Sequence, residues 1–311
     1  MIKKKGAIQI SFSWLFAIIV GIVILTLAIY AVVKGVSTSE MSQTAQAGKE
    51  LSVLFNSLES GFESGQFSSF SIPSESRIYN GCDNFGKFGT QIISLEQKNF
   101  GKFTKTNMEI SSKNLYLFSE KFVQGKNFYV FSKSLEMPFE IATLNYFTSA
   151  EEKYCFEEVE EEAEDVAQEI FNLKQPNLVF GPCSGNEIVV CFGNYGSNCD
   201  IKVHYDLGYL EKDGEEIYFG NDALLYAAIF SDKEVYECQL KRLMKRLESL
   251  ISIYEEKVIF LSDRCGTEMS SSLISMENSL ESFESSENLL EIISTSEYLE
   301  NKNRQVLCRL W

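Results

Sequence analysis

The amino end of the chain carries an uncharged run at residues 7–33, directly behind the lysines at positions 3–5. The most apolar part of this run is residues 14–33. A helix rises about 1.5 Å per residue, so about twenty apolar residues cross the hydrocarbon core of a bilayer. The sequence therefore predicts one transmembrane helix over residues 7–33, with the lipid bilayer as its partner.

The charges beside this run predict its orientation. Three lysines precede it, whereas only Lys34 follows it before Glu40. Cationic flanks are retained on the cytoplasmic side, so we expect a cell-membrane protein with residues 1–6 inside and residues 34–311 extracellular. The alternative is a secretory signal cleaved after Ala31, but this apolar run exceeds the 7–15 residues usual for signal peptides. Both interpretations export the rest of the chain.

A shorter pattern overlies the start of the apolar run. The segment Lys4-Lys5-Gly6-Ala7-Ile8, followed by a long apolar helix, resembles the class III signal of type IV pilins and archaellins, especially archaeal ones. The resemblance covers about the first thirty residues, and it implies cleavage between Gly6 and Ala7 by a prepilin peptidase. It also implies a helix that packs in a filament core or stays in the membrane. Ser11 stands where bacterial major pilins carry glutamate. Two alternatives therefore remain: a homo-oligomer or pilus-like assembly, and a pilin-like anchor that does not polymerise.

The charge balance excludes one class of partner. The chain has 28 Lys and Arg against 44 Asp and Glu, and its net charge is −16. Phosphate binding needs clustered cations, so we exclude nucleic acid as a partner. The exported part would also be repelled by anionic lipid headgroups.

All cysteines lie beyond the apolar run. An even number in an exported domain predicts disulfides, with the pairing left open. The eight candidates are Cys82, Cys155, Cys183, Cys191, Cys199, Cys238, Cys265 and Cys308. Cys183, Cys191 and Cys199 recur every eight residues and, with His204, suggest zinc as an alternative. Zinc sites usually contain cysteines two to four residues apart, so we expect no metal here. We also expect no cofactor.

The pattern of apolar residues predicts an α+β fold beyond the span. Apolar positions three and four apart, from Leu51 to Phe62, predict an amphipathic stalk helix over residues 34–65. Residues 66–230 form the expected disulfide-containing ectodomain, which is rich in short strands, has one helix over residues 151–173, and has a hairpin turn at Asp213-Gly214.

Residues 231–311 are predicted to form an antiparallel helical hairpin. A capping pattern at Ser231 and Glu234 begins it. Two coiled-coil-like seams follow, and a break at residues 263–266 separates them. The seams contain Leu240, Leu243, Leu247, Leu250 and Tyr254, then Leu273, Met276, Leu280 and Phe283.

Two charge clusters are candidate binding features. Seven acidic residues within 157–165 suggest calcium, although a solvated helix face explains the run more simply. A cationic patch of Lys241, Arg242, Lys245 and Arg246 suggests a docking surface for an acidic partner or for the 157–165 segment. A solvated face is again the simpler alternative.

Catalytic chemistry has little support in the sequence. The one histidine, His204, lies in a predicted strand without a serine elbow nearby, and no phosphate-binding glycine loop is present. We therefore expect no catalytic residues and infer a single-pass surface protein with a structural or binding role, with a pilin-like subunit as one form. The alternatives are a tethered extracellular hydrolase that uses paired carboxylates and a subunit of a larger secretion or pilus machine.

Overall fold

The computed structural model describes residues 12–59, 67–99, 101–157, 163–193, 198–265 and 269–311. The chain divides into two compact units, Met1–Glu50 and Leu51–Trp311. The proposed processing site between Gly6 and Ala7 lies outside the described residues.

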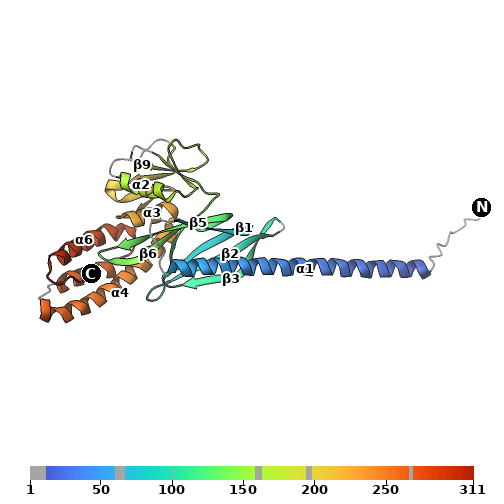
Figure 1. Cartoon of the computed structure of the whole chain (residues 1–311), viewed down its shortest axis with the longest axis horizontal. Helices are drawn as coiled ribbons and strands as arrows, with labels where there is room; N and C mark the ends of the chain where they lie inside the picture. The colour runs from blue at the N-terminus through green and yellow to red at the C-terminus, as the bar shows by residue number, and fades with distance from the viewer. Residues whose placement is uncertain (1–11, 60–66, 100, 158–162, 194–197, 266–268) are drawn as a thin grey trace, which may run out of the picture. The chain divides into compact units, whose positions relative to one another are not determined.

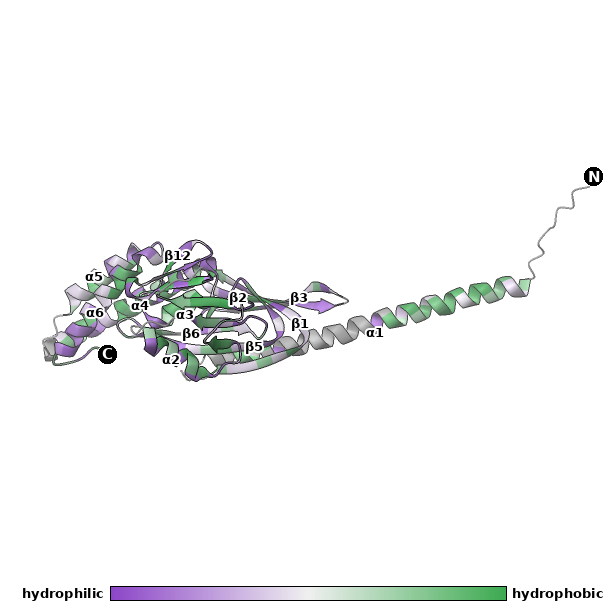
Figure 2. Ribbon diagram, turned by 90° about the horizontal axis from the view of Figure 1, so that it is seen from above, coloured by the Kyte–Doolittle hydropathy of each residue, from purple (hydrophilic) through white to green (hydrophobic). Residues whose placement is uncertain are grey.

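Helix α1 (Phe12–Glu59) contains the predicted membrane span. Its segment Phe12–Val32 is long and apolar enough to cross a membrane, and Figure 2 shows the predominantly hydrophobic colouring of this part of the helix. The Thr26 hydroxyl donates to the carbonyls of Ile22 and Val23, both at 2.9 Å, so this polar group is satisfied within the helix. The helix continues into the predicted stalk and ends at Glu59.

A six-stranded sheet begins the second unit, with strand order β3-β2-β1-β5-β6-β4 (Figure 1). All its pairings are antiparallel except that of β4 with β6. Alternate residues of β2 are buried, among them Ile93 and Leu95, as expected for a sheet with one covered face. The strands are β1 (Phe67–Asp83), β2 (Thr90–Asn99), β3 (Lys102–Ser112), β4 (Tyr116–Phe118), β5 (Phe122–Glu136) and β6 (Glu140–Ser149).

The second sheet has strand order β12-β11-β10-β9-β7-β8 and mixes parallel and antiparallel pairs. The predicted hairpin is present, with φ of 54° at Asp213 and 78° at Gly214, as its tight turn requires. The expected helix over 151–173 is too long, because Tyr154–Glu157 pairs as β7; among the described residues of this range, the α-helix is α2 (Glu164–Leu173). The other strands are β8 (Leu178–Phe180), β9 (Ile188–Phe192), β10 (Ile201–His204), β11 (Tyr209–Lys212) and β12 (Glu215–Tyr218).

The carboxyl-terminal part is helical, as predicted, but its expected second arm is divided in two. It consists of α4 (Lys233–Cys265), α5 (Ser270–Glu281) and α6 (Leu289–Gln305), preceded by the buried α3 (Asp222–Phe230). The predicted seams are buried at Leu240, Leu243, Leu247, Leu273, Met276 and Leu280.

The predicted helix cap at Ser231 is wrong. The Ser231 hydroxyl donates to the Ala227 carbonyl at the end of α3, and Asp232 accepts from the Glu234 amide to begin α4.

Three disulfides stabilise the second unit and confirm the predicted oxidised cysteines at six positions. Cys82–Cys238 joins β1 to α4, whereas Cys155–Cys183 and Cys191–Cys199 lie in and beside the second sheet. Cys308 is also disulfide-bonded, and the side chain of Cys265 is outside the described set. The two sheets and the helices of the second unit together make the fold mixed α+β.

Candidate binding cleft

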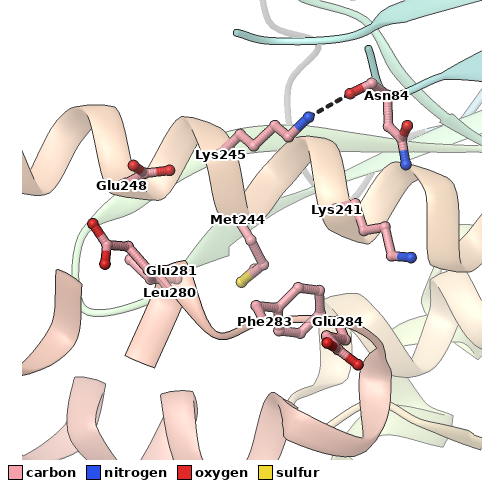
Figure 3. Close-up of a pocket in the computed structure, with 9 residues that line it drawn as sticks. All are labelled: Asn84, Lys241, Met244, Lys245, Glu248, Leu280, Glu281, Phe283 and Glu284. Carbon is pink, nitrogen blue, oxygen red and sulfur yellow. Dashed lines mark hydrogen bonds between the residues drawn. The ribbon is translucent and has the colours of Figure 1, made fainter. Parts of the chain in front are cut away.

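A cleft of about 660 Å³ opens where α4, the end of α5 with its following turn, and the loop between β1 and β2 meet (Figure 3). All three parts belong to the second unit. The cleft is lined by Asn84, Lys241, Met244, Lys245, Glu248, Leu280, Glu281, Phe283 and Glu284.

One stripe of α4 forms the first wall. These residues, Lys241, Met244, Lys245 and Glu248, occupy positions i, i+3, i+4 and i+7, so they share a face beside the buried leucine seam. Met244 is only 2% exposed, and its sulfur lies beside the ring of Phe283 (Figure 3). Met244 thus forms an apolar floor with Leu280, which is 5% exposed, and Phe283.

The turn after α5 forms the opposite wall, and hydrogen bonds define its shape. The side-chain oxygen of Asn288 accepts from the amides of Glu284 at 3.1 Å and Ser285 at 3.3 Å. The Glu237 carboxylate, from α4, accepts from the Ser286 amide at 3.0 Å and from its hydroxyl at 2.5 Å. The acidic groups of this turn are therefore carried by a positioned backbone.

The loop between β1 and β2 is fastened to α4 at two places. The Cys82–Cys238 disulfide joins the two elements with a Cα–Cα distance of 6.1 Å. The Lys245 ammonium donates to the Asn84 carbonyl and, at 3.2 Å, to the Gly86 carbonyl. Two of the three ammonium protons are thereby directed to the loop rather than to the cleft.

A buried arginine completes this attachment. Arg242 is fully buried, and its guanidinium donates to the carbonyls of Leu115 and Lys113, both at 3.0 Å, and of Phe88 at 3.2 Å. It also lies 4.7 Å from the ring centre of Tyr116, a cation–π geometry. Burial lowers the pKa of Arg242, but the residue stays charged because its ordinary value is so high.

The structure removes Arg242 from the predicted cationic docking patch and leaves Lys241, Lys245 and Arg246 half-buried. Arg242 is inaccessible, and Arg246 donates from Nε to the Ile141 carbonyl at 2.7 Å. Lys245 is committed to the loop. The physical reason is that positions 242 and 246 lie about 100° around the helix from 241 and 245 and face the ends of the first sheet.

Carboxylates dominate the open rim of the cleft. Glu281 and Glu284 are exposed, and Glu248 is half-buried. Within the described part of the chain, none of the three lies within ion-pair distance of a cation. Lys241 is the cation of the cleft for which the described residues supply no hydrogen bond or ion pair. The rim is thus net acidic over an apolar floor.

A second cleft of about 510 Å³ has a different character. Its cations are largely paired: Lys121 contacts Glu234 at 2.6 Å, and Lys233 contacts Glu215 at 3.4 Å. Lys212, also in its lining, contacts Glu120 at 2.5 Å. All three lysines of this cleft are thus paired with glutamates, while Asp213, Asp232 and Glu237 leave its lining net acidic as well.

The cysteines proposed as zinc ligands are not available as thiolates. Cys183 is bonded to Cys155, and Cys191 to Cys199. A possible ligand group of Cys155, Glu157 and Cys183 has its atoms within 4.8 Å, but its two sulfurs share a covalent bond. Zinc binding by cysteine requires thiolates, so this oxidised arrangement does not fit it.

The lone histidine is part of a strand pair. His204 stacks on Tyr209 at 4.5 Å between ring centres, and its Nε2 lies 3.2 Å from a Glu211 oxygen. It lines neither cleft. This arrangement is that of a partnered strand histidine.

The acidic run does not meet the α4 cations in the described structure. Glu157 accepts from the Cys183 amide at 2.7 Å, and residues 158–162 lie outside the described set. Farther along α2, Glu169 pairs with Lys133 and accepts from the Tyr226 hydroxyl at 2.9 Å. This carboxylate thus joins α2 to β5 and α3.

One carboxyl group that the sequence did not single out lies between the two sheets. Glu152 is in the turn from β6 to β7, and one of its oxygens is buried without a hydrogen-bond partner. Burial, and secondarily the charge of Glu120, raises the pKa of Glu152 to about 7, while Lys212 opposes the shift. The preceding residues 149–151 gave no sequence signal for this burial.

Some features of the cleft had a readable signal. The spacing of Ser285 and Asn288 is a capping pattern, and it marks the turn that carries Glu284. The three carbonyls bound by Arg242 belong to residues far away in the sequence, so no local pattern indicated them. The chain matches no protein-family model, no curated protein and no solved structure.

Proposed function

We propose that this chain is a single-pass membrane-anchored surface protein whose extracellular part has a binding or structural role. The observation that carries the proposal is the segment Phe12–Val32, a helical segment long and apolar enough to cross a membrane. Exposure of so much apolar surface to water is unfavourable, whereas a bilayer accommodates it. The lysines at 3–5 favour a cytoplasmic amino end.

The oxidised cysteines support the exported location of the second unit. Disulfides persist in extracellular and periplasmic compartments and are rare in reducing cytosol. The three bridges between described cysteines, and the bonded Cys308, lie beyond the span, which agrees with an extracellular carboxyl-terminal domain. The binding role rests on the acidic-rimmed cleft, because an apolar floor with a few polar groups is typical of recognition sites.

Protease accessibility tests the topology. Protease added to intact cells should digest an epitope placed after Trp311, since the proposal puts that end outside. A cytoplasmic marker protein is the control for cell integrity. Survival of the epitope while a known external marker is cut would show that the orientation is reversed.

The pilin-like form of the proposal is tested at the amino end. The segment Lys4 to Ile8 supports cleavage after Gly6, and sequencing of the native, membrane-extracted protein reads the result. A start at Ala7 supports a pilin-like subunit. A start at Val32 indicates ordinary secretion, and an intact amino end indicates a plain signal anchor.

No observation among the described residues favours the hydrolase alternative. Such an enzyme needs two carboxyl groups that face one substrate. The two glutamates with raised pKa, Glu152 and Glu255, line neither cleft.

A further inference from the structure

We propose that the cleft between α4 and the turn after α5 binds a segment of a partner protein that presents an apolar side chain next to an arginine or lysine. The inference deepens the binding role proposed above and rests on it. It specifies the partner by two complementary features of the cleft, its floor and its rim.

The floor selects the apolar side chain. Met244, Leu280 and Phe283 come from two separate helical segments and converge on one point (Figure 3). Their shared hollow of about 660 Å³ exceeds the volume of a single side chain, so it can take one residue and part of its neighbours. Methionine and phenylalanine adapt to such a guest because both are polarisable, and methionine is flexible.

The rim selects the cation. Glu248, Glu281 and Glu284 have no cation within ion-pair distance among the described residues, so a guest cation would not have to displace an existing partner. An anionic guest would depend on Lys241 and Lys245. Lys245 already donates to two loop carbonyls, and redirecting it would leave those carbonyls unpaired.

The charge of the chain argues against a second copy as the occupant. With a net charge of −16, two copies repel each other, and a surface with an acidic rim would add to that repulsion. A basic segment is instead attracted over long range before it docks. The cleft is also pre-formed, since the Cys82–Cys238 bridge and the Glu237 hydrogen bonds hold two of its walls.

The test uses the full chain in nanodiscs with ¹³C-labelled methionine methyl groups, and Met244 is the reporter. The probe is acetyl-leucyl-arginine amide, with acetyl-leucyl-glutamate amide and acetyl-seryl-arginine amide as matched comparators. Met244→Leu, which conserves volume, assigns the signal. We expect the leucyl-arginine probe to shift the Met244 signal saturably and to bind about tenfold more tightly than the leucyl-glutamate probe, as two exposed ion pairs allow.

Paired variants locate the charge effect. Glu281→Gln with Glu284→Gln should remove most of the preference for the arginine probe. Glu291→Gln with Glu297→Gln changes the same charge at exposed positions of α6 and should leave it intact. Equal binding of both leucyl probes, no shift at any soluble probe concentration, or indifference to the first pair would overturn the proposal.

Two further outcomes separate this proposal from its alternatives. A Met244 shift that grows with protein concentration, without any probe, would overturn the proposal in favour of self-association. Tight binding of the seryl-arginine probe would show that the floor contributes nothing and would equally overturn it. Because the assay does not read topology, its failure leaves membrane anchoring standing, and reversed topology would leave the cleft result standing.

Discussion

The buried carboxyl group of Glu152 should make the second unit less stable as the pH rises. Its folded-state pKa is about 7, above the ordinary 4.5, because burial and then Glu120 disfavour the charged form. The folded protein therefore holds a proton that the unfolded chain releases between these two values. The stability that Glu152 contributes is fully present below about pH 4.5 and is lost as the pH rises through 7.

The size of the effect follows from the same two pKa values. Each pH unit between them changes the free energy of unfolding by about 1.4 kcal/mol, so the full interval gives at most about 3 kcal/mol. The observed value should be smaller, since the ionised carboxylate can shift toward Lys212, which opposes the change in pKa. Tyr154 also faces this carboxyl group, and its fully buried hydroxyl has no hydrogen-bond partner among the described groups.

Glu152→Gln isolates this contribution. The amide cannot ionise, so the variant should match the parent near pH 4.5 and exceed it above pH 7 by 1 to about 3 kcal/mol. Glu151→Gln, an exposed neighbour with the same change of charge, should follow the parent at every pH. Urea unfolding followed by near-ultraviolet circular dichroism from pH 4.5 to 8.5 gives the difference.

The parent and Glu152→Gln share every other acidic group, including Glu255 with its raised pKa. The contributions of those groups therefore cancel in the difference between the two free energies of unfolding. The reasoning is refuted if the parent and Glu152→Gln curves stay parallel over this range. It is also refuted if Glu151→Gln produces the same separation.

Three further predictions concern the cleft and its supports. Paired Cys→Ser changes that remove the Cys82–Cys238 bridge should destabilise the protein roughly 2–3 kcal/mol more than those that remove Cys191–Cys199. The first bridge closes a loop of 156 residues and the second a loop of 8, so the first restricts the unfolded chain more; melting curves of the two variants give the difference. Gly89→Ala should lower the free energy of unfolding by about 2 kcal/mol, because the new Cβ would lie 2.3 Å from the Asp83 carbonyl oxygen. Gly86→Ala, where φ is also positive but the space around the Cβ is open, should lower it by about 1 kcal/mol; urea unfolding measures both. Lys241→Gln should tighten binding of the leucyl-arginine probe about twofold by removing a like charge, and weaker binding in the same methyl titration would contradict the acidic-rim argument.

Local patterns predicted the elements of this fold well where the physics is local. The apolar run predicted a helix long enough to span a membrane, and Asp213-Gly214 predicted the hairpin turn, because each depends on residues close together in the sequence. The helix over 151–173 was overextended because the acidic helical pattern was continued back over Tyr154 to Glu157, whose aromatic residues favour a strand and pair with β8 and β9. Strand pairing is non-local, so tertiary context decides it.

The position of the cap before α4 shows a finer limit. Ser231 and Asp232 are both good capping residues, and the sequence pattern with Glu234 favoured the serine. The structure uses both, but for different helices: the serine closes α3 and the aspartate opens α4. Helix α3 was not among the predicted elements, so the serine was not expected at the end of a helix.

The cationic face of α4 was misread because burial of an arginine is not visible in sequence. Positions 241 and 245 form one stripe and positions 242 and 246 another, and only the second faces carbonyls at the ends of β4 and β6. A guanidinium satisfies several carbonyls at once, so an arginine can be buried there without a carboxylate partner. The buried guanidinium keeps its charge but is withdrawn from the surface, so it is not available to a ligand. Four cations in two adjacent pairs suggest a basic face, but Arg242 is inaccessible, while Arg246 and Lys245 donate to backbone carbonyls. The glutamates of the cleft then outnumber its one uncommitted lysine. The acidic character of the cleft, and hence the basic partner inferred for it, thus follows from where the arginines go rather than from composition.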